Sequence, residues 1–181
     1  MKRATAPSLK TDGGEAALKK SGVPPREIQE LWFASRRRPW TSLAVVAVTP
    51  GSSALPIARA LAEIGGIVSG HPVRVMSAEG VDLSEIATLV MDLTGDAPTS
   101  VWTSVPGTSP SAPFAAGAKG QRVIVAVESV VANPLVLPLV LAADAALLCI
   151  EKGKTRIEDA RHTIELIGRE RLLGSALLHP R

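Results

Sequence analysis

The chain has 181 residues, of which 46% are hydrophobic and only 3% aromatic, so the core of a single domain must be built from Ala, Val, Leu and Ile. Its one cysteine, Cys149, excludes an internal disulfide and a multi-cysteine zinc site, and we expect it to be buried in a strand. The net charge of +3 comes from residues 1–40, which hold nine basic and four acidic residues.

The N-terminus and the apolar runs indicate neither export nor membrane insertion. Residues 1–20 are polar and charged, unlike a secretory signal. The most apolar stretch, residues 130–150, is interrupted by two prolines and Asp144 before it reaches the roughly 18 residues of a membrane span. We therefore expect a cytoplasmic protein, either free or peripheral at the inner face of the plasma membrane.

In chain order, residues 1–25 are expected to form a basic, flexible lead, and residues 26–181 a single domain. Apolar side chains recur at helical spacing in residues 26–35. This spacing predicts a helix in which Trp32 and Phe33 are bulky anchors. A basic linker that contains a proline follows the helix.

The stretch from Ser42 to Gly66 organises the rest of the chain. A valine-rich run at residues 43–48 predicts a buried strand, residues 49–53 predict a tight loop, and the following spacing predicts a helix that stops at Gly65 and Gly66. In an α/β protein this arrangement points the free N–H groups of the helix at the sheet edge, where phosphates usually bind.

The remaining residues predict alternating strands and helices. We expect strands at residues 71–76, 100–104, 122–127, 145–150 and 172–178, with an exposed loop at residues 106–120. A helix is expected from Leu83 to a stop at Gly95. A second helix is expected after the cap Asn133, and Pro138 implies that it is short or kinked. A third is expected after a capping box that begins at Thr155. The fold class is therefore α/β, a doubly wound, mostly parallel sheet with helices on both faces.

This order resembles a known family. A helix that ends in Phe33-Ala34-Ser35, a basic linker, the strand at residues 43–48 and its degenerate loop are similar to the cytoplasmic domain of bacterial tyrosine kinases that control capsule and exopolysaccharide export. The segments 105–110 and 141–156 are similar too. The family belongs to the partitioning-ATPase class of P-loop proteins, so the resemblance implies a three-layer P-loop fold over about residues 26–180.

The sequence departs from the family at its catalytic positions. The resemblance places the phosphate-binding lysine at Ala54, the magnesium-binding hydroxyl at Leu55 and the Walker B aspartate near Ala126, with Glu128 two residues on; near the family's other acidic motif only Glu79 is acidic. Without these groups, charge on a transferring phosphoryl group is not stabilised. We expect neither an enzyme nor a bound cofactor or metal, although ATP binding is left open.

Two further family features are missing. The kinases phosphorylate a tyrosine cluster in a C-terminal tail, whereas this chain contains no tyrosine. They assemble through a glutamate with arginines three and six residues on; here Glu30 is followed by Phe33 and Arg36 at those spacings. A self-phosphorylating tyrosine kinase is therefore not expected.

Candidate site residues are few. Gly51, Ser52 and Ser53 are expected to form at most a weak anion site at the helix N-terminus. Thr155 of Gly153-Lys154-Thr155 is interpreted as a helix cap, since the first glycine of a Walker motif is missing. The three histidines have no metal-ligand spacing.

Three functional hypotheses follow. The first is a pseudoenzyme that docks in, or regulates, polysaccharide export or envelope assembly, with a protein partner such as a membrane chain-length regulator, and with homo-oligomers left open. The second is a switch that binds a nucleotide weakly without hydrolysing it. The third is an adaptor whose basic N-terminal residues contact acidic lipid or nucleic acid, of which nucleic acid is the less expected partner.

Overall fold

The computed structural model describes residues 26–94 and 122–179, and every structural statement concerns this part of the chain. Its five strands are β1 (Ser42–Ala47), β2 (Arg74–Ala78), β3 (Val123–Val127), β4 (Ala145–Glu151) and β5 (Leu172–Leu178). Its α-helices are α2 (Arg26–Ser35), α3 (Leu55–Ser69), α4 (Leu83–Thr94), α5 (Leu137–Ala142) and α6 (Ile157–Ile167). Two short 3-10 helices, η1 (Pro134–Val136) and η2 (Arg169–Arg171), complete the elements.

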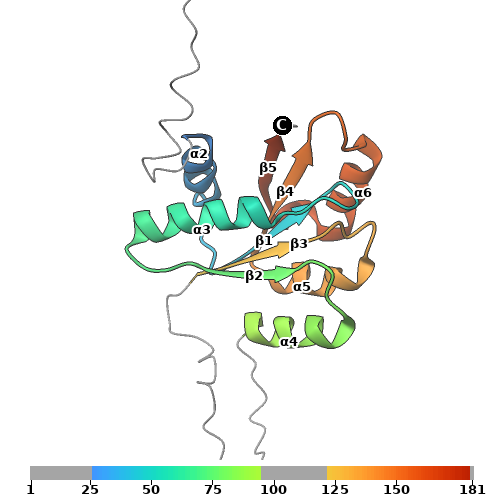
Figure 1. The fold of residues 1–181 in the computed structure, drawn as a ribbon, viewed down its shortest axis with the longest axis horizontal. Coiled ribbons are helices and arrows are strands. Elements are labelled where there is room, and N and C mark those ends of the chain that lie inside the picture. Colours follow the sequence, from blue (N-terminus) through green and yellow to red (C-terminus); the bar gives the residue numbers. More distant parts are fainter. Residues whose placement is uncertain (1–25, 95–121, 180–181) are drawn as a thin grey trace, which may run out of the picture.

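The strands form one parallel sheet in the order β2-β3-β1-β4-β5 (Figure 1). The central strand β1 pairs with β3 on one side and with β4 on the other, so that Leu43 lies between Ile124 and Ala145. All six residues of β1 are buried, as expected for a parallel strand covered on both faces. The predicted α/β fold class is confirmed.

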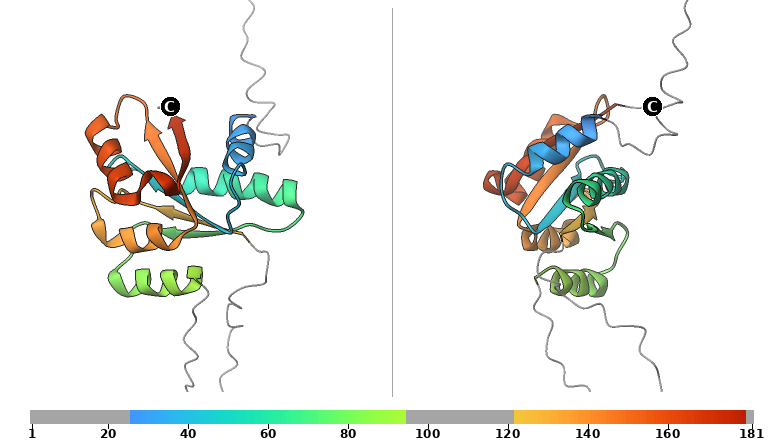
Figure 2. Two further views of the ribbon diagram at one scale, coloured as in Figure 1. Left: turned by 180° about the vertical axis from the view of Figure 1, so that it is seen from behind. Right: turned by 90° about the vertical axis from the view of Figure 1, so that its left-hand side faces the viewer.

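Helices cover both faces of the sheet (Figure 2). On one face, α2 and α3 pack a core that contains Trp32, Leu61 and the β1 residue Val45. On the other face, α4, α5 and α6 pack a second core, which contains Ile86 and Leu139. The molecule therefore has three layers, and the central strand β1 contributes side chains to both cores.

The predicted stop of the first long helix is wrong. Helix α3 continues through Gly65 and Gly66 to Ser69, and Gly70, with φ of 70°, caps it in the left-handed conformation. Gly65 is needed for packing instead: a Cβ added there would lie 2.5 Å from the ring carbon Cη2 of Trp32. The glycine allows α2 to approach α3 closely.

Other local predictions had mixed outcomes. Trp32 is buried as predicted, but Phe33 is 57% exposed, so the anchor role assigned to it is wrong. Strand β2 begins at Arg74 and ends at Ala78, later than the predicted strand. The expected lead at residues 1–25, strand at 100–104 and loop at 106–120 lie outside the described residues.

The cap at Asn133 is confirmed, since its side chain accepts a hydrogen bond from the Leu135 amide. Pro138 lies in the first turn of the short helix α5, which follows η1, and this agrees with the predicted interruption. The capping box at Thr155 is wrong: Arg156 is the N-cap residue of α6 and makes no side-chain cap hydrogen bond. The Thr155 hydroxyl instead contacts the Thr49 hydroxyl.

Candidate functional site

The candidate site lies at the carboxyl edge of the sheet, beside β1. Helix α3, which follows β1, covers one face, while η1 and α5, which follow β3, cover the other. Neighbouring strands whose connections leave toward opposite faces open a crevice at their carboxyl ends, and ligands of open α/β sheets bind there. The loop between β1 and α3 borders this crevice.

The loop is a tight turn followed by the helix start. Gly51 has φ of 76°, a left-handed conformation that a glycine adopts without strain, and the Ser52 amide donates to the Thr49 carbonyl at 3.1 Å. Ala54 is fully buried in the core under α3. The sequence-predicted residues Gly51, Ser52 and Ser53 are thus together in one turn before the N-terminus of α3.

A carboxylate of the protein itself occupies this N-terminus. Glu79, the residue after β2, accepts hydrogen bonds from the Ala54 amide at 2.7 Å and from the Leu55 amide at 3.2 Å, both on Oε1. The Ser53 hydroxyl lies 2.9 Å from Oε1 and 2.8 Å from Oε2. The first amides of a helix have no partner within the helix, and the N-cap residue Ala54 has no side-chain acceptor. Glu79 supplies this acceptor from the turn after β2.

A second carboxylate holds the other side of the loop. Glu151, at the end of β4, lies 2.8 Å from the Lys154 ammonium group. Hydrogen bonds from Lys154 and from the Ser52 side chain lower the pKa of Glu151. The positive charge of Lys154 is therefore paired at this edge, and Ser52 donates to a carboxylate that is ionised at neutral pH.

Thr155 joins the two loops at this edge. Its hydroxyl lies 2.6 Å from the Thr49 hydroxyl and accepts a hydrogen bond from the Glu151 amide at 2.8 Å. This contact explains why Thr155 does not cap α6. It fixes the β4–α6 turn against the start of the β1–α3 loop.

A third carboxylate, Glu128, follows β3. It accepts from the Asn133 side-chain amide at 2.9 Å and from the Gly80 amide at 3.4 Å. Next to it, the buried Ser129 hydroxyl donates to the Val48 carbonyl at 2.9 Å. Glu128 thus ties the β2–α4 turn to the β3–η1 turn.

The three carboxylates do not form a metal centre. Within residues 26–94 and 122–179, no three His, Cys, Asp or Glu side chains are placed to hold a metal ion together. Each carboxylate instead accepts hydrogen bonds from its own neighbouring loops. A phosphate group that entered the crevice would meet the negative charges of Glu79 and Glu128, whereas the charge of Glu151 is paired with Lys154, and like charges at short range repel.

In the sequence, Glu79 stands out only as the one acidic residue near a family motif. A signal for its role is its position directly after a strand, because parallel strands end at the same edge as the loop. Glu151 is the last residue of β4, and Thr155 lies four residues later in the turn at the same edge. Their partners could not be read from the sequence, since Glu79 is 25 residues from Ala54 and Thr155 is 106 residues from Thr49.

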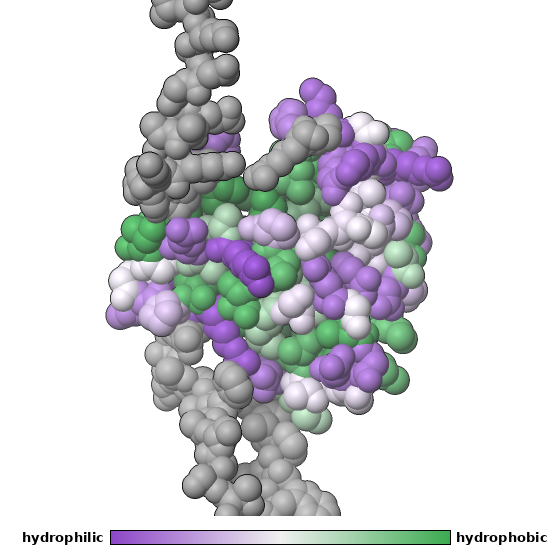
Figure 3. All heavy atoms as spheres, in the orientation of Figure 1, coloured by the Kyte–Doolittle hydropathy of each residue, from purple (hydrophilic) through white to green (hydrophobic). Residues whose placement is uncertain are grey.

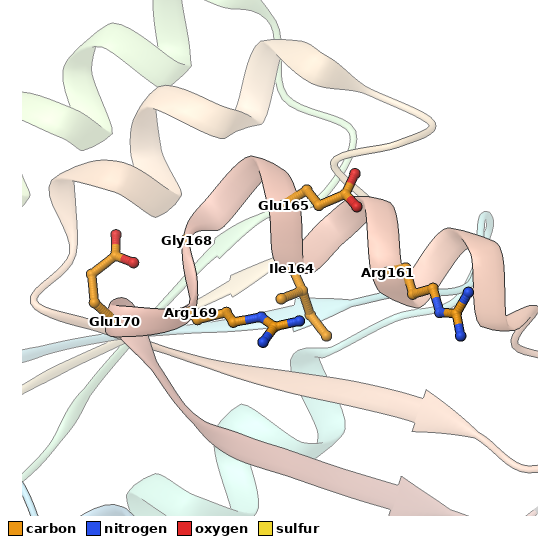
Figure 4. A pocket seen from close by; sticks show the side chains of 6 residues that line it. All are labelled: Arg161, Ile164, Glu165, Gly168, Arg169 and Glu170. Atoms are coloured by element: carbon orange, nitrogen blue, oxygen red, sulfur yellow. The ribbon is translucent and has the colours of Figure 1, made fainter.

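A shallow pocket of about 540 Å³ lies away from this edge, at the C-terminal end of α6 (Figure 4). It is lined by Arg161, Ile164, Glu165, Gly168, Arg169 and Glu170. These residues come from one helix and the turn after it, and Figure 4 shows their side chains spread along the helix rather than converging on one point. Since β5 begins just after this turn, the pocket lies toward the amino edge of the sheet and is separate from the candidate site.

No protein-family model, no curated protein and no solved structure matched the chain in the comparisons made. The resemblance to the P-loop domain of the polysaccharide-export kinases therefore remains a hypothesis that rests on the residues themselves. None of the helices in the described part of the chain is both long enough and apolar enough to cross a membrane.

Proposed function

We propose that this chain is a noncatalytic P-loop-like protein that docks in, or regulates, bacterial exopolysaccharide or capsule biosynthesis and export. The observation that carries the noncatalytic part is the Glu79 carboxylate on the α3 amides. In a phosphate-binding loop these amides face the phosphates. Here they are satisfied by a group of the protein itself.

The residues of the loop agree with this proposal. A lysine at position 54 would have to enter the core, because the Ala54 side chain is fully buried. The nearby Lys154 is paired with Glu151. A nucleotide would therefore have to displace Glu79 and then bind near the Glu128 carboxylate. The positions that the resemblance assigns to the lysine and the magnesium-binding hydroxyl, Ala54 and Leu55, offer neither charge nor hydroxyl to a phosphoryl-transfer transition state.

The biological setting of the proposal comes from the resemblance. A protein that keeps the fold without the chemistry offers its surface to a partner, and we place that partner in the polysaccharide-export or envelope-assembly machinery, with a membrane chain-length regulator as the first candidate. The site of action would be the cytoplasm or the inner face of the plasma membrane. Gene neighbourhood and co-purification with such a regulator are the observations that bear on this part.

The test of the noncatalytic site is calorimetric titration of the full chain with ATP and ADP, with and without magnesium, beside a hydrolysis assay. We expect no binding heat at millimolar nucleotide and no turnover. Magnesium-dependent binding with hydrolysis would overturn the proposal. Binding without hydrolysis would instead support a nucleotide-binding switch, which one observation favours: the Ser53 hydroxyl and the Ala54 amide already bind an anionic group, the Glu79 carboxylate.

The variants Glu79→Gln and Glu128→Gln separate the two possibilities. Glu79→Gln removes the negative charge from the α3 amides, whereas the matched control Glu128→Gln removes a carboxylate at the same edge that does not touch them. If Glu79 closes the site, inorganic phosphate binds measurably to the first variant alone. Equal phosphate binding by both variants and the wild type would show that Glu79 does not block the loop.

A further inference from the structure

The two edges of the sheet differ in how they are protected. Within the described residues the sheet ends at β2 and at β5. β2 has five residues and begins with Arg74, which pairs with Asp92 at 3.2 Å. β5 has seven residues, reads LLGSALL, and carries neither a charge nor a proline. Short length, charge and proline are common means of blocking edge-to-edge pairing, and β5 has none of these three. Its one irregularity is a register shift against β4 at Leu173, near the start of the strand.

An apolar groove lies between α2 and β5, beside this edge of the described sheet. Its volume is about 340 Å³, and it is lined by residues of α2, by Ile57 of α3 and by residues 175–178 of β5. Figure 3 shows hydrophobic surface between the positions of α2 and β5. On β5, Leu177 is 56% exposed. An additional strand at this edge would pair with β5 and cover apolar surface on α2.

We propose that β5 pairs antiparallel with β5 of a second copy of this chain, so that two five-stranded sheets join into one around a twofold axis. Alternate residues Gly174, Ala176 and Leu178 share the face of the sheet that α2 covers, as their pairing with Leu147, Cys149 and Glu151 of β4 shows. With Ala176 on the axis, Leu178 of each copy lies opposite Gly174 of the other.

The shapes of these residues fit that register. No atom lies within 4 Å of the position that a Cβ of Gly174 would take, so space is open there for a side chain of another strand. Leu178 would occupy this space, and directly opposite residues of antiparallel strands point to the same face. The small Ala176 pairs with itself on the axis. The surface at a twofold interface must be complementary to itself, and in this register β5 is complementary to a second, antiparallel β5.

The charges beside β5 also suit pairing with a second, antiparallel copy. Helix α2 runs antiparallel to β5: the Arg38 guanidinium donates to the Glu170 carbonyl just before β5, whereas Glu27 and Glu30 flank the groove at the end of β5. Glu30 is paired with Arg26 at 2.7 Å, so the opposite charges that flank β5 here are Arg38 at its start and Glu27 at its end. Antiparallel pairing brings Glu27 of each copy toward Arg38 of its partner, which favours a second copy over an unrelated strand.

The first test is the oligomeric state of the full chain, measured by sedimentation equilibrium over a range of concentrations. We expect a reversible dimer, and we expect Leu177→Lys to raise its dissociation constant at least about tenfold, because two positive charges enter the edge around the axis. The matched control is Leu83→Lys, since Leu83 is 64% exposed on α4 and distant from β5. A monomer at all concentrations, or a dimer weakened equally by both variants, would overturn the proposal.

The second test fixes the register. Residues opposite each other in antiparallel strands have Cα atoms about 4.5–5.5 Å apart, within the range of a disulfide. We expect Ala176→Cys to form a disulfide-linked dimer on mild oxidation, whereas Ser175→Cys, whose two copies would lie diagonally across the axis, stays unlinked. Cys149 is buried and does not interfere. Linking of Ser175→Cys without linking of Ala176→Cys would contradict the proposed pairing.

Discussion

Glu79 caps a helix that lies far from it in the sequence. Its carboxylate accepts from two backbone amides of α3 and from Ser53, and charge-assisted hydrogen bonds of this kind are stronger than those between neutral groups. The same contact satisfies the start of the helix and fills the position of a ligand. One residue therefore links the stability of α3 to the state of the candidate site.

This link gives a prediction for Glu79→Ala. We expect the free energy of unfolding to fall by about 1–3 kcal/mol, because the variant leaves the Ala54 amide without its acceptor and leaves the Leu55 amide with only the Ser53 hydroxyl at 3.2 Å. Urea denaturation of both proteins measures the difference. The control is Glu63→Ala, an exposed position further along α3, where a change of less than about 0.5 kcal/mol is expected. A Glu79→Ala variant as stable as the wild type would contradict the capping role.

Cys149 is the chain's one thiol, and the structure predicts that it is unreactive. It is only 3% exposed on β4. Burial, followed by the negative charges of Glu151 and Glu79, raises the pKa of the Cys149 thiol to about 12. The thiolate is the reactive form, so almost none is present at pH 8. We expect a chromogenic disulfide reagent to leave the native protein unmodified and to titrate one thiol in denaturant; rapid reaction of the native protein would show that β4 is accessible.

At the scale of elements, the contact between α2 and α3 depends on Gly65. Gly65→Ala places a methyl group 2.5 Å from the Trp32 ring and 2.8 Å from a Val73 methyl, so the two helices must separate. Overpacking of this kind costs about 1–3 kcal/mol. The adjacent Gly66→Ala meets nothing closer than the His71 carbonyl at 3.8 Å and should be neutral or stabilise α3 by about 0.5–1 kcal/mol. Thermal unfolding of both variants gives the comparison; equal shifts in Tm would contradict the packing argument.

The regular elements were predictable because their signals are local. Runs of apolar residues marked β1, β3 and β4, and the helical spacing that begins at Leu83 marked α4. The end of α3 was not predictable from Gly65, because a glycine that stops a helix and a glycine that lets another helix approach look the same in sequence. Only the position of Trp32 distinguishes them.

The candidate site was predictable in part. The strand, turn and helix start at residues 43–56 located it, and the absence of a lysine at Ala54 indicated lost chemistry. The group that occupies the start of α3, the Glu79 carboxylate, could not be inferred from the sequence. Its hydrogen bond with the Ala54 amide depends on where β2 ends relative to β1. Likewise, Thr155 matched a capping box by spacing, but the Thr49 hydroxyl is its partner in the fold.

At the scale of the whole molecule, Asp144 holds the two central strands together at their amino ends. Its Oδ2 atom accepts from the Thr41 amide at 2.8 Å, the Thr41 hydroxyl at 2.6 Å and the Ser42 amide at 2.9 Å, while the Asp144 amide donates to the Ser42 hydroxyl at 2.9 Å. These bonds join the start of β1 to the residue before β4. They fix the register from which both sheet faces are built.

This network predicts how stability depends on pH. Partial burial raises the pKa of Asp144, but the hydrogen bonds from Thr41 and Ser42 outweigh it, so the pKa lies below its ordinary value. A carboxyl group with a lowered pKa in the folded state contributes stability above the pKa of the unfolded chain, about 3.9, and loses that contribution as pH falls through the folded value. Acid should therefore weaken the link between β1 and β4.

The variant Asp144→Asn tests this directly. At pH 7 we expect it to be less stable than the wild type by about 1 kcal/mol, a value reduced to allow for the exposure of the carboxylate. Below about pH 4 the wild type loses the charged acceptor as well, so the difference between the two proteins should shrink toward zero by about pH 2. Urea midpoints measured from pH 7 to pH 2 follow this convergence, with Glu63→Gln as an exposed control. A difference that stays constant across the range would mean that Asp144 acts through packing and not through its charge.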